Sequence, residues 1–451
     1  MSSRAGPGSP PTRLPPPVAD DESEVVTTNA LLDDLDARGL IHDTTDRDRL
    51  AQRLNEGPVV VYAGFDPTAD SLHVGNLVPL LLLRRFRDAG HQGIALAGGA
   101  TGMIGDPSGR SEERNLLDED QLATNLAGIK PQLVQILGEG ATFVDNYSWT
   151  RDVTLLEFLR EVGKHVTVNQ MVAKESIRSR MEGTDGISYT EFTYTLLQAF
   201  DYWHLHEAHG CELQVGGSDQ WGNITAGIDL IRRRTGDHVH GLTVPLVTRA
   251  DGQKFGKSVD GAVWLSAERT SPYRFYQYWM QIADADVERF LLQLTLLPVE
   301  EARAIAAAHA EAPHCRDGQR ALARQLTTML HGEAACAGAE AASGVLFGGR
   351  TDALDGAALD LLAAEVPCTE LPRSAVLGAD LVDLLVATGL ASSKGEARRS
   401  LDQRGISVNN DKVEPGFSPA EEHLLDGRAL LLRKGKSTYH AIFFASEVDA
   451  G

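Results

Sequence analysis

Three side chains on one predicted helix combine the types and the spacing that binding a small polar molecule requires. In the run YTEFTYTLLQAFDYW, residues 189–203, Tyr194, Gln198 and Asp201 are spaced i, i+4 and i+7, so they share one face of a helix. The opposite face is apolar. A phenol, an amide and a carboxylate can together bind an ammonium group and a phenol, although the periodicity also fits an ordinary amphipathic helix with a solvated polar face.

A second run, YAGFDPTADSLHVGNL at residues 62–77, joins a predicted buried strand to a predicted helix. The strand ends the unbroken apolar segment 59–62, which is typical of a strand covered on both faces of a parallel sheet. Turn formers interrupt it, and Ser71 is the expected N-cap of the helix. Backbone N–H groups at a helix start attract anions, so we expect phosphate to bind here, beside His73 and Asn76.

Three more predicted strands end in loops of similar design. They lie within GIALAGGATGMIGDPSGR (93–110), ELQVGGSDQWGN (212–223) and LTVPLVTRADGQKFGKS (242–258). Strands that alternate with helices predict a doubly wound parallel α/β sheet, in which ligands bind beyond the carboxyl ends of the strands. The four loops therefore indicate one shared site.

Two common nucleotide-binding motifs do not fit these loops. The glycine spacing of GGATGMIG differs from the dinucleotide fingerprint, and no matching acidic residue follows it. GQKFGKS has one residue too few between its glycines for a phosphate-binding Walker loop. Taken alone, Lys254 and Lys257 also fit a solvated turn, and His73 also fits a hydrogen-bonded cap residue.

The length, the net charge and the composition of the chain limit the class of protein. The 451 residues carry a net charge of −21, with 42% apolar and 23% charged residues, so the chain can bury a large core but is unsuited to coating nucleic acid with its whole surface. A local basic site is compatible with that total. No apolar run is long enough to span a bilayer. The scattered cysteines lack metal or redox spacing, which predicts a reduced, cytoplasmic protein with no metal site made by protein alone.

The pattern divides the chain into five segments. Residues 1–28 are rich in proline and contain an acidic run, which predicts a disordered tail and argues against a targeting signal. Residues 29–250 hold the predicted doubly wound domain. Residues 251–350 begin with the KFGKS loop and continue as an α-helical domain, residues 351–374 form a predicted linker, and residues 375–451 form a small α+β module.

Five of the runs occur in the same order in one family. YAGFDPTADSLHVGNL, GGATGMIGDPSGR, YTEFTYTLLQAFDYW, VGGSDQWGN and KFGKS resemble the motifs of bacterial-type tyrosyl-tRNA synthetases, and the resemblance extends from about residue 29 to the C-terminus. It implies a class I aminoacyl-tRNA synthetase with a Rossmann-like catalytic domain, a helical domain at the anticodon region and a C-terminal RNA-binding module. Such an enzyme converts L-tyrosine and ATP to tyrosyl-adenylate and pyrophosphate, then transfers tyrosyl to the 3′-terminal ribose of its tRNA.

The resemblance also assigns roles to the matching positions. Tyr62 and Asp201 would hold the phenol hydroxyl of tyrosine. The residues expected around its ammonium and carboxylate groups are Asp106, Tyr194, Gln198 and Gln220. The matching ATP-binding positions are Gly64, Asp66, Thr68, His73, Asn76, Gly217, Asp219 and Lys257. The positions expected to act on the phosphates during catalysis are Thr68, His73, Asn76, Lys254 and Lys257. The candidate tRNA contacts in the C-terminal module are Lys394, Arg398, Arg399 and Arg404.

By the same resemblance, the partners are tRNA(Tyr), L-tyrosine and ATP. Mg²⁺ would arrive with ATP, no cofactor would be tightly bound, and the chain would form a homodimer. Asn76 departs from the family signature, which often has a second histidine there, but its amide N–H can take nearly the place of a ring N–H. The competing interpretations are the tryptophan-specific relative, a catalytically inactive RNA-binding paralogue and, more distantly, a dinucleotide oxidoreductase. The Tyr62 and Asp201 pair argues against the first, and the intact motifs argue against the second.

Overall fold

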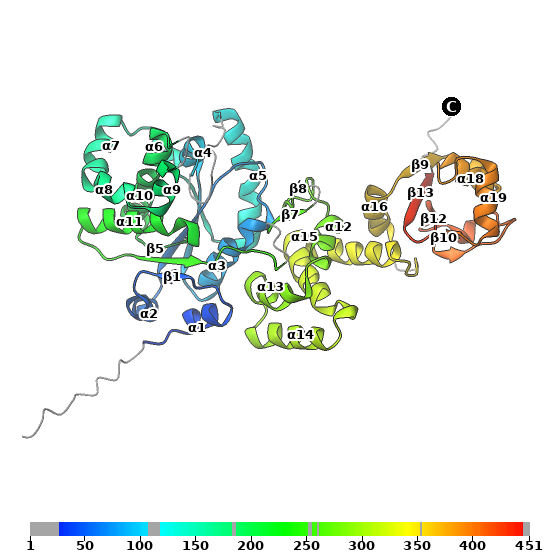
Figure 1. Ribbon diagram of the computed structural model, residues 1–451, viewed down its shortest axis with the longest axis horizontal. Coiled ribbons are helices and arrows are strands. Elements are labelled where there is room, and N and C mark those ends of the chain that lie inside the picture. Colours follow the sequence, from blue (N-terminus) through cyan, green and yellow to red (C-terminus); the bar gives the residue numbers. More distant parts are fainter. Residues whose placement is uncertain are drawn as a thin grey trace, which may run out of the picture.

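The computed structural model describes residues 27–106, 118–182, 186–250, 255–258, 261–351 and 354–444. Three units follow one another along the longest axis of the molecule: an α/β unit, a helical unit and a small C-terminal unit (Figure 1). The predicted disordered tail, except for Thr27 and Thr28, lies outside the described residues.

A six-stranded sheet forms the centre of the α/β unit. In the order in which they lie side by side, its strands are β1 (Asp43–Thr44), β6 (His240–Val244), β5 (Cys211–Gly217), β2 (Val60–Phe65), β3 (Gln92–Ala97) and β4 (Thr142–Asp145). All neighbouring pairs are parallel except β1 and β6. The chain proceeds from β2 to one side and returns to the other side at β5, so the strand order reverses between these two strands. Doubly wound sheets bind ligands at this point.

Helices cover both faces of this sheet, as the sequence predicts. Because side chains alternate along a strand, Val61 and Ala63 of β2 face α3 (Leu77–Asp88) and α5 (Glu119–Leu137). Tyr62 faces the other way, toward the cluster formed with α10 and α11. Those two helices are α10 (Tyr189–His209) and α11 (Trp221–Arg234). Tyr62 and the polar face of α10 therefore lie on the same side of the sheet.

The remaining elements of the unit are short. Before and beside the sheet lie α1 (Ala30–Ala37), α2 (Arg47–Glu56), η1 (Val74–Asn76), α4 (Gly99–Ile104) and η3 (Ser218–Gln220). Between β4 and α10 lie α6 (Tyr147–Thr150), α7 (Leu155–Glu161), η2 (Gly163–His165), α8 (Val168–Val172) and α9 (Glu175–Glu182). The glycine-rich segment after β3, expected as a loop, thus contains a helix, and the first residues of this helix are buried.

The cap predicted before α3 was wrong. The capping side chain is that of His73, not Ser71: it is the N-cap of the 3-10 turn η1, which leads directly into α3, and it accepts a hydrogen bond from the Gly75 N–H at 3.0 Å. The hydroxyl of Ser71 is buried and donates to the Leu72 carbonyl at 2.8 Å instead. Serine favours caps and turns, but here the 3-10 turn η1 precedes α3, so the capped position lies two residues after Ser71, at His73.

The helical unit follows a hairpin of β7 (Lys257–Ser258) and β8 (Gly261–Ala262). Its elements are α12 (Pro272–Met280), η4 (Asp284–Asp286), α13 (Val287–Leu294), α14 (Val299–Glu311), η5 (Pro313–Cys315) and α15 (Asp317–Leu346). The side chains of Trp279 and Phe290 are fully buried and belong to the same large core as the sheet. The helical and α/β units therefore share one hydrophobic core.

The C-terminal unit begins earlier than predicted. Residues 351–374, expected as a linker, contain the helix α16 (Gly356–Glu365) and the strand β9 (Cys368–Leu371). β9 pairs in parallel with β13 (Thr438–Phe444) at the edge of a five-stranded sheet ordered β11-β10-β12-β13-β9. The other elements are α17 (Arg373–Val376), α18 (Leu381–Ala387), α19 (Lys394–Asp402), β10 (Ile406–Val408), β11 (Asp411–Lys412), η6 (Glu421–His423) and β12 (Ala429–Lys434).

Candidate active site

A pocket of about 860 Å³ opens beyond the carboxyl ends of β2 and β5, where the strand order reverses. The sequence-predicted residues that line it are Tyr62, Gly64, Asp66, Thr68, His73, Asn76, Asp106, Tyr194, Gln198, Asp201, Gly217, Asp219 and Gln220. They come from four segments that are distant in the sequence. Lys254 lies outside the described residues, as does the side chain of Lys257, whose backbone begins β7.

Asp201 forms the most constrained part of the pocket. Its side chain is buried, and its two carboxylate oxygens accept hydrogen bonds from Asn146 Nδ2 at 2.8 Å and from Trp149 Nε1 at 2.9 Å. Asn146 is itself oriented, because its Oδ1 accepts the Ala100 N–H at 2.7 Å. Burial raises the pKa of Asp201 to about 7, although the two donors act in the opposite direction.

Asn146 and Trp149 were not identified from the sequence. They belong to a segment between β4 and α7 whose sequence has no recognisable motif, and they lie 55 and 52 residues before Asp201. The only sequence signal is that a polar residue, Asn146, directly follows the strand β4 and that an aromatic residue, Trp149, comes three positions later. Their hydrogen bonds fix both oxygens of Asp201 before any ligand arrives.

The hydroxyl of Tyr62 is an uncompensated polar group. Tyr62 is 1% exposed, and its hydroxyl has no hydrogen-bond partner among the residues that the structure describes. Burial first, and then the charge of Asp201, raise the pKa of this phenol well above its usual range, so the group is a neutral donor. A buried hydroxyl without a partner costs free energy, which indicates a position that a ligand completes.

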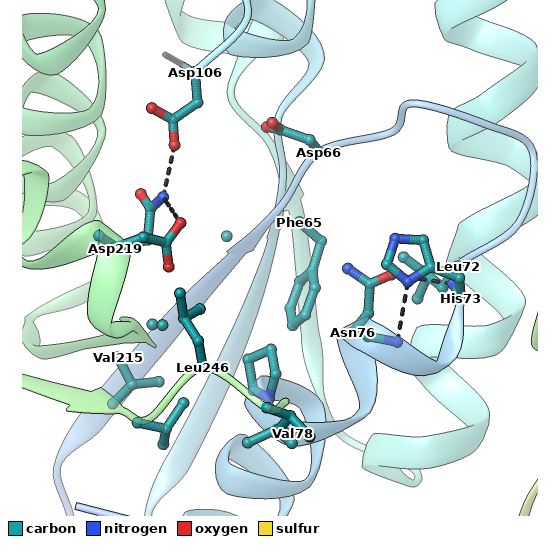
Figure 2. A pocket seen from close by; sticks show the side chains of 18 of the residues that line it. Phe65, Asp66, Leu72, His73, Asn76, Val78, Asp106, Val215, Asp219 and Leu246 are labelled. Atoms are coloured by element: carbon teal, nitrogen blue, oxygen red, sulfur yellow. Dashed lines mark hydrogen bonds between the residues drawn. The ribbon is translucent and has the colours of Figure 1, made fainter. Parts of the chain in front are cut away.

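A cluster of acidic side chains forms the next part of the pocket. The amide Nε2 of Gln220 donates to Asp106 Oδ2 at 2.6 Å and to Asp219 Oδ2 at 3.0 Å, which joins the two carboxyl groups (Figure 2). Burial raises the pKa of Asp219, and the neighbouring charge of Asp106 adds to this effect. Two carboxylates around one amide favour a cationic group of a ligand.

The opposite side of the pocket carries His73 and Asn76 (Figure 2). The Asn76 Oδ1 accepts the His73 N–H at 3.0 Å, which leaves the amide Nδ2 as its donor group. Because His73 Nδ1 accepts from Gly75, a neutral His73 ring carries its proton on Nε2 and donates there. Both residues therefore offer N–H donors, as a phosphate site requires.

The described part of the KFGKS run lies against this turn. Gly256 has φ +81°, and a Cβ at this position would lie 3.3 Å from the Gly75 nitrogen. The Gly256 N–H donates to the buried Tyr278 hydroxyl at 3.1 Å. Phe255 lines the pocket and packs against Phe290, with ring centroids 5.3 Å apart. The two predicted phosphate motifs therefore adjoin in the structure.

The candidate RNA contacts lie far from this pocket. Lys394, Arg398 and Arg399 are exposed residues of α19, and Arg404 follows that helix. Lys394 pairs with Asp383 at 2.5 Å and Arg404 pairs with Glu414 at 3.0 Å, so both basic groups already have an acidic neighbour. Exposed ion pairs of this kind are weak and can be exchanged for phosphate contacts.

Metal-binding clusters and membrane-spanning helices are both absent from the described ranges. These ranges contain no group of three or more His, Cys, Asp or Glu side chains placed to hold a metal ion. In the same ranges, no helix combines the length and the apolar character needed to cross a bilayer.

Comparison with known families gives a consistent result. A sequence profile for class I tRNA synthetases of the tryptophan and tyrosine type matches residues 54–348. A second profile, for the C-terminal domain of tyrosine–tRNA ligases, matches residues 359–442 and thus begins inside the predicted linker. Together the two matches span the three units of the structure.

Individual proteins are similar over nearly the whole chain. The tyrosine–tRNA ligase of Opitutus terrae is 55% identical over 91% of this chain and 99% of its own length. The tyrosine–tRNA ligase of Rhodopirellula baltica is 50% identical over 91% of this chain and 96% of its own length. Among solved structures, a C-terminally truncated mitochondrial tyrosyl-tRNA synthetase of Aspergillus nidulans is 33% identical, has a TM-score of 0.63, and covers 68% of this chain and 92% of its own.

Proposed function

The chain belongs to the tyrosine–tRNA ligases, within the class I tRNA synthetases, and on this premise we propose how its pocket serves that reaction. The protein activates L-tyrosine with ATP, forming tyrosyl-adenylate and pyrophosphate, and then transfers tyrosyl to the 3′-terminal ribose of tRNA(Tyr). The carboxylate of tyrosine attacks the α-phosphorus. A carboxyl O–P bond forms as the P–O bond to pyrophosphate breaks, so the protein needs no nucleophile of its own.

The observation that carries this proposal is the pairing of Tyr62 with Asp201. The Tyr62 hydroxyl is a buried donor without a described partner, and both oxygens of Asp201 are already oriented by neighbours. The phenol hydroxyl of tyrosine both accepts and donates, so it can accept a hydrogen bond from the Tyr62 hydroxyl and donate one to Asp201. An indole N–H only donates and would leave Tyr62 unsatisfied, which favours tyrosine over tryptophan.

The acidic cluster suits the other end of the amino acid. Asp106, together with Tyr194 and Gln198 of α10, lines the same pocket as Asp201. We assign the ammonium group of tyrosine to these three residues and its carboxylate to the neighbourhood of Gln220. In this orientation the reacting carboxylate points toward the His73 turn.

ATP occupies the remaining space in this proposal. Gly64, Asp66, Gly217 and Asp219 line the part of the pocket assigned to adenosine. The groups assigned to the phosphates are Thr68, His73, Asn76, Lys254 and Lys257. N–H donors held at a helix start can stabilise negative charge that grows on pyrophosphate in the transition state. Mg²⁺ accompanies ATP as part of the substrate.

The exposed apolar face of α7 supports the homodimer. Leu155 and Leu156 are 71% and 74% exposed, and Leu159 is 45% exposed on the same short helix. Contiguous apolar surface of this kind marks an interaction site. A second copy covers it in our proposal, and the sedimentation of Leu156→Asp as a monomer would bear this out.

The α19 residues Lys394, Arg398 and Arg399, with Arg404, contact tRNA in this proposal. The enzyme acts in the cytoplasm.

Amino-acid-dependent ATP–pyrophosphate exchange tests the activation step directly. Exchange with tyrosine, but not with phenylalanine or tryptophan, is the expected result. A folded protein that binds tRNA(Tyr) and catalyses no exchange with any of the three amino acids would instead be an inactive RNA-binding relative.

A further inference from the structure

The pocket has an unusual balance of charge for a site that binds a polyanion. Four carboxyl groups line it: Asp66, Asp106, Asp201 and Asp219. Arg249 is the single lysine or arginine among the described lining residues. ATP brings several negative charges into this acidic surrounding, so its phosphates need cationic partners, and an arginine fork matches phosphate oxygens well.

The backbone on both sides of Arg249 is fixed by the helical unit. The carbonyl of Thr248 accepts a hydrogen bond from Arg289, and the N–H of Ala250 donates to Asp286 Oδ2 at 2.9 Å. Arg289 also pairs with Asp286, which is 1% exposed. Two side chains of one short segment, paired with each other, thus hold the residues before and after Arg249.

Asp286 and Arg289 together form a clamp on the backbone around Arg249. The following contacts connect this clamp to the phosphate side of the pocket. Val244, the last residue of β6, and the residues 245–249 that follow it line the pocket without interruption, and Phe255 lines it again. Phe255 packs against Phe290, the neighbour of Arg289, and Gly256 adjoins the His73 turn through Gly75. Arg249 therefore enters the pocket from the segment that leads to the lysine motif.

We propose that Arg249 is a phosphate-binding residue for ATP, and that Asp286 and Arg289 are the positioning residues that hold it in place before ATP binds. This inference rests on the proposed function and adds a residue to it. In this proposal Arg249 contacts the phosphates in the bound substrate and in the transition state alike. Such uniform binding lowers KM for ATP and leaves kcat nearly unchanged.

Exchange kinetics with Arg249→Gln test the proposal. We expect KM for ATP to rise about tenfold, the loss of roughly one charge-assisted contact, with kcat within threefold of the unchanged protein. Tyrosine affinity, measured by fluorescence titration without ATP, should not change. Arg232→Gln is the matched control, since Arg232 is an exposed arginine of α11 that pairs with Asp229 outside the pocket. It should behave as the unchanged protein.

Three results would overturn the inference. An unaltered KM for ATP in a folded Arg249→Gln protein would remove the phosphate contact. Unaltered exchange with reduced aminoacylation would make Arg249 a tRNA contact instead. A fall in kcat alone would place it with groups that act only in the transition state. Failure of the proposed function is separate, because the unchanged protein would then show no exchange at all.

Substitutions of Asp286 test the positioning role. Asn keeps an oxygen for the Ala250 N–H, whereas Ala removes it. We expect Asp286→Ala to raise KM for ATP as Arg249→Gln does, and Asp286→Asn to recover part of that loss, with thermal unfolding showing that both proteins fold. The same KM in both variants would contradict a role that depends on this hydrogen bond.

Discussion

The two halves of the pocket are built in different ways. The tyrosine half consists of side chains on a strand and a long helix, and Tyr62 and Asp201 are both almost completely buried. The phosphate half consists of a turn and a 3-10 helix whose side chains His73 and Asn76 are partly exposed. Its last component, the lysine motif, continues on a short hairpin.

The difference reflects what each half must do. To recognise one amino acid, polar groups must be buried and fixed beforehand, because only then does the wrong side chain leave them unsatisfied. To stabilise charge that develops on pyrophosphate, donors need to be complete only in the transition state. We therefore expect changes in the first half to alter tyrosine binding, and changes at the His73 turn in the second half to alter the rate of activation.

The largest effect is expected for Asp201→Ala. It removes the acceptor of two donors, the buried Asn146 and the partly buried Trp149, and each donor left unsatisfied costs up to about 1–3 kcal/mol. Together with the lost contact to the phenol, kcat/KM for tyrosine in pyrophosphate exchange should fall roughly 1,000-fold. Asp201→Asn, which keeps one acceptor oxygen, should lose less. Equal losses in both variants would mean that the buried donors contribute nothing.

His73→Ala is expected to have the next largest effect, on the other half. Loss of one donor to the developing charge should lower kcat about 100-fold and leave the tyrosine dissociation constant unchanged. His73→Asn is the matched control, because it can still accept the Gly75 N–H but does not reach as far. If Asn restored full activity, His73 would serve only as a cap and the contrast between the halves would weaken.

A pH dependence of about tenfold is expected for tyrosine binding. Burial raises the pKa of Asp201 to about 7, so the carboxyl is ionised above that pH and protonated below it. The ionised form accepts the phenol hydroxyl, and tyrosine should bind roughly tenfold more weakly at pH 6 than at pH 8. Fluorescence titration measures this, and Asp201→Asn should show no such dependence. An equal pH dependence in Asp201→Asn would assign it to another group.

The smallest effect is expected for Asn76→His. The substituted ring can donate an N–H toward the phosphates, and its other nitrogen can accept the His73 N–H that Asn76 Oδ1 accepts now. Adenylate formation should change less than tenfold, about 1.4 kcal/mol, in single-turnover measurements. A larger loss would show that the amide has a role that a histidine does not fill.

Local patterns predicted much of the fold and the arrangement of the pocket. The apolar run before Tyr62 predicted a buried strand, and the i, i+4, i+7 spacing predicted the helix face that brings Tyr194, Gln198 and Asp201 into the pocket. Both predictions depend on the regular period of one element. The parallel order of the strands followed from their alternation with helices.

Contacts between distant segments were missed for a physical reason. Asn146 and Trp149 act on Asp201 through the tertiary fold, and a single polar residue after a strand has no period that reveals its partner. The same applies to Arg249, one arginine in a loop. The strand β9 was missed because its four residues, Cys368–Leu371, do not alternate between apolar and polar side chains.

This short strand determines where the chain can be divided. β9 covers the edge of β13, and Pro367 and Pro372 flank it, so the outer edge it presents is short and a poor template for another strand. A fragment cut at the predicted boundary, residue 375, would expose the longer edge of β13 and would tend to self-associate. A fragment that keeps this unit intact must therefore include β9 and α16, and also the end of α15, because Ala342 and Val345 belong to the same hydrophobic core.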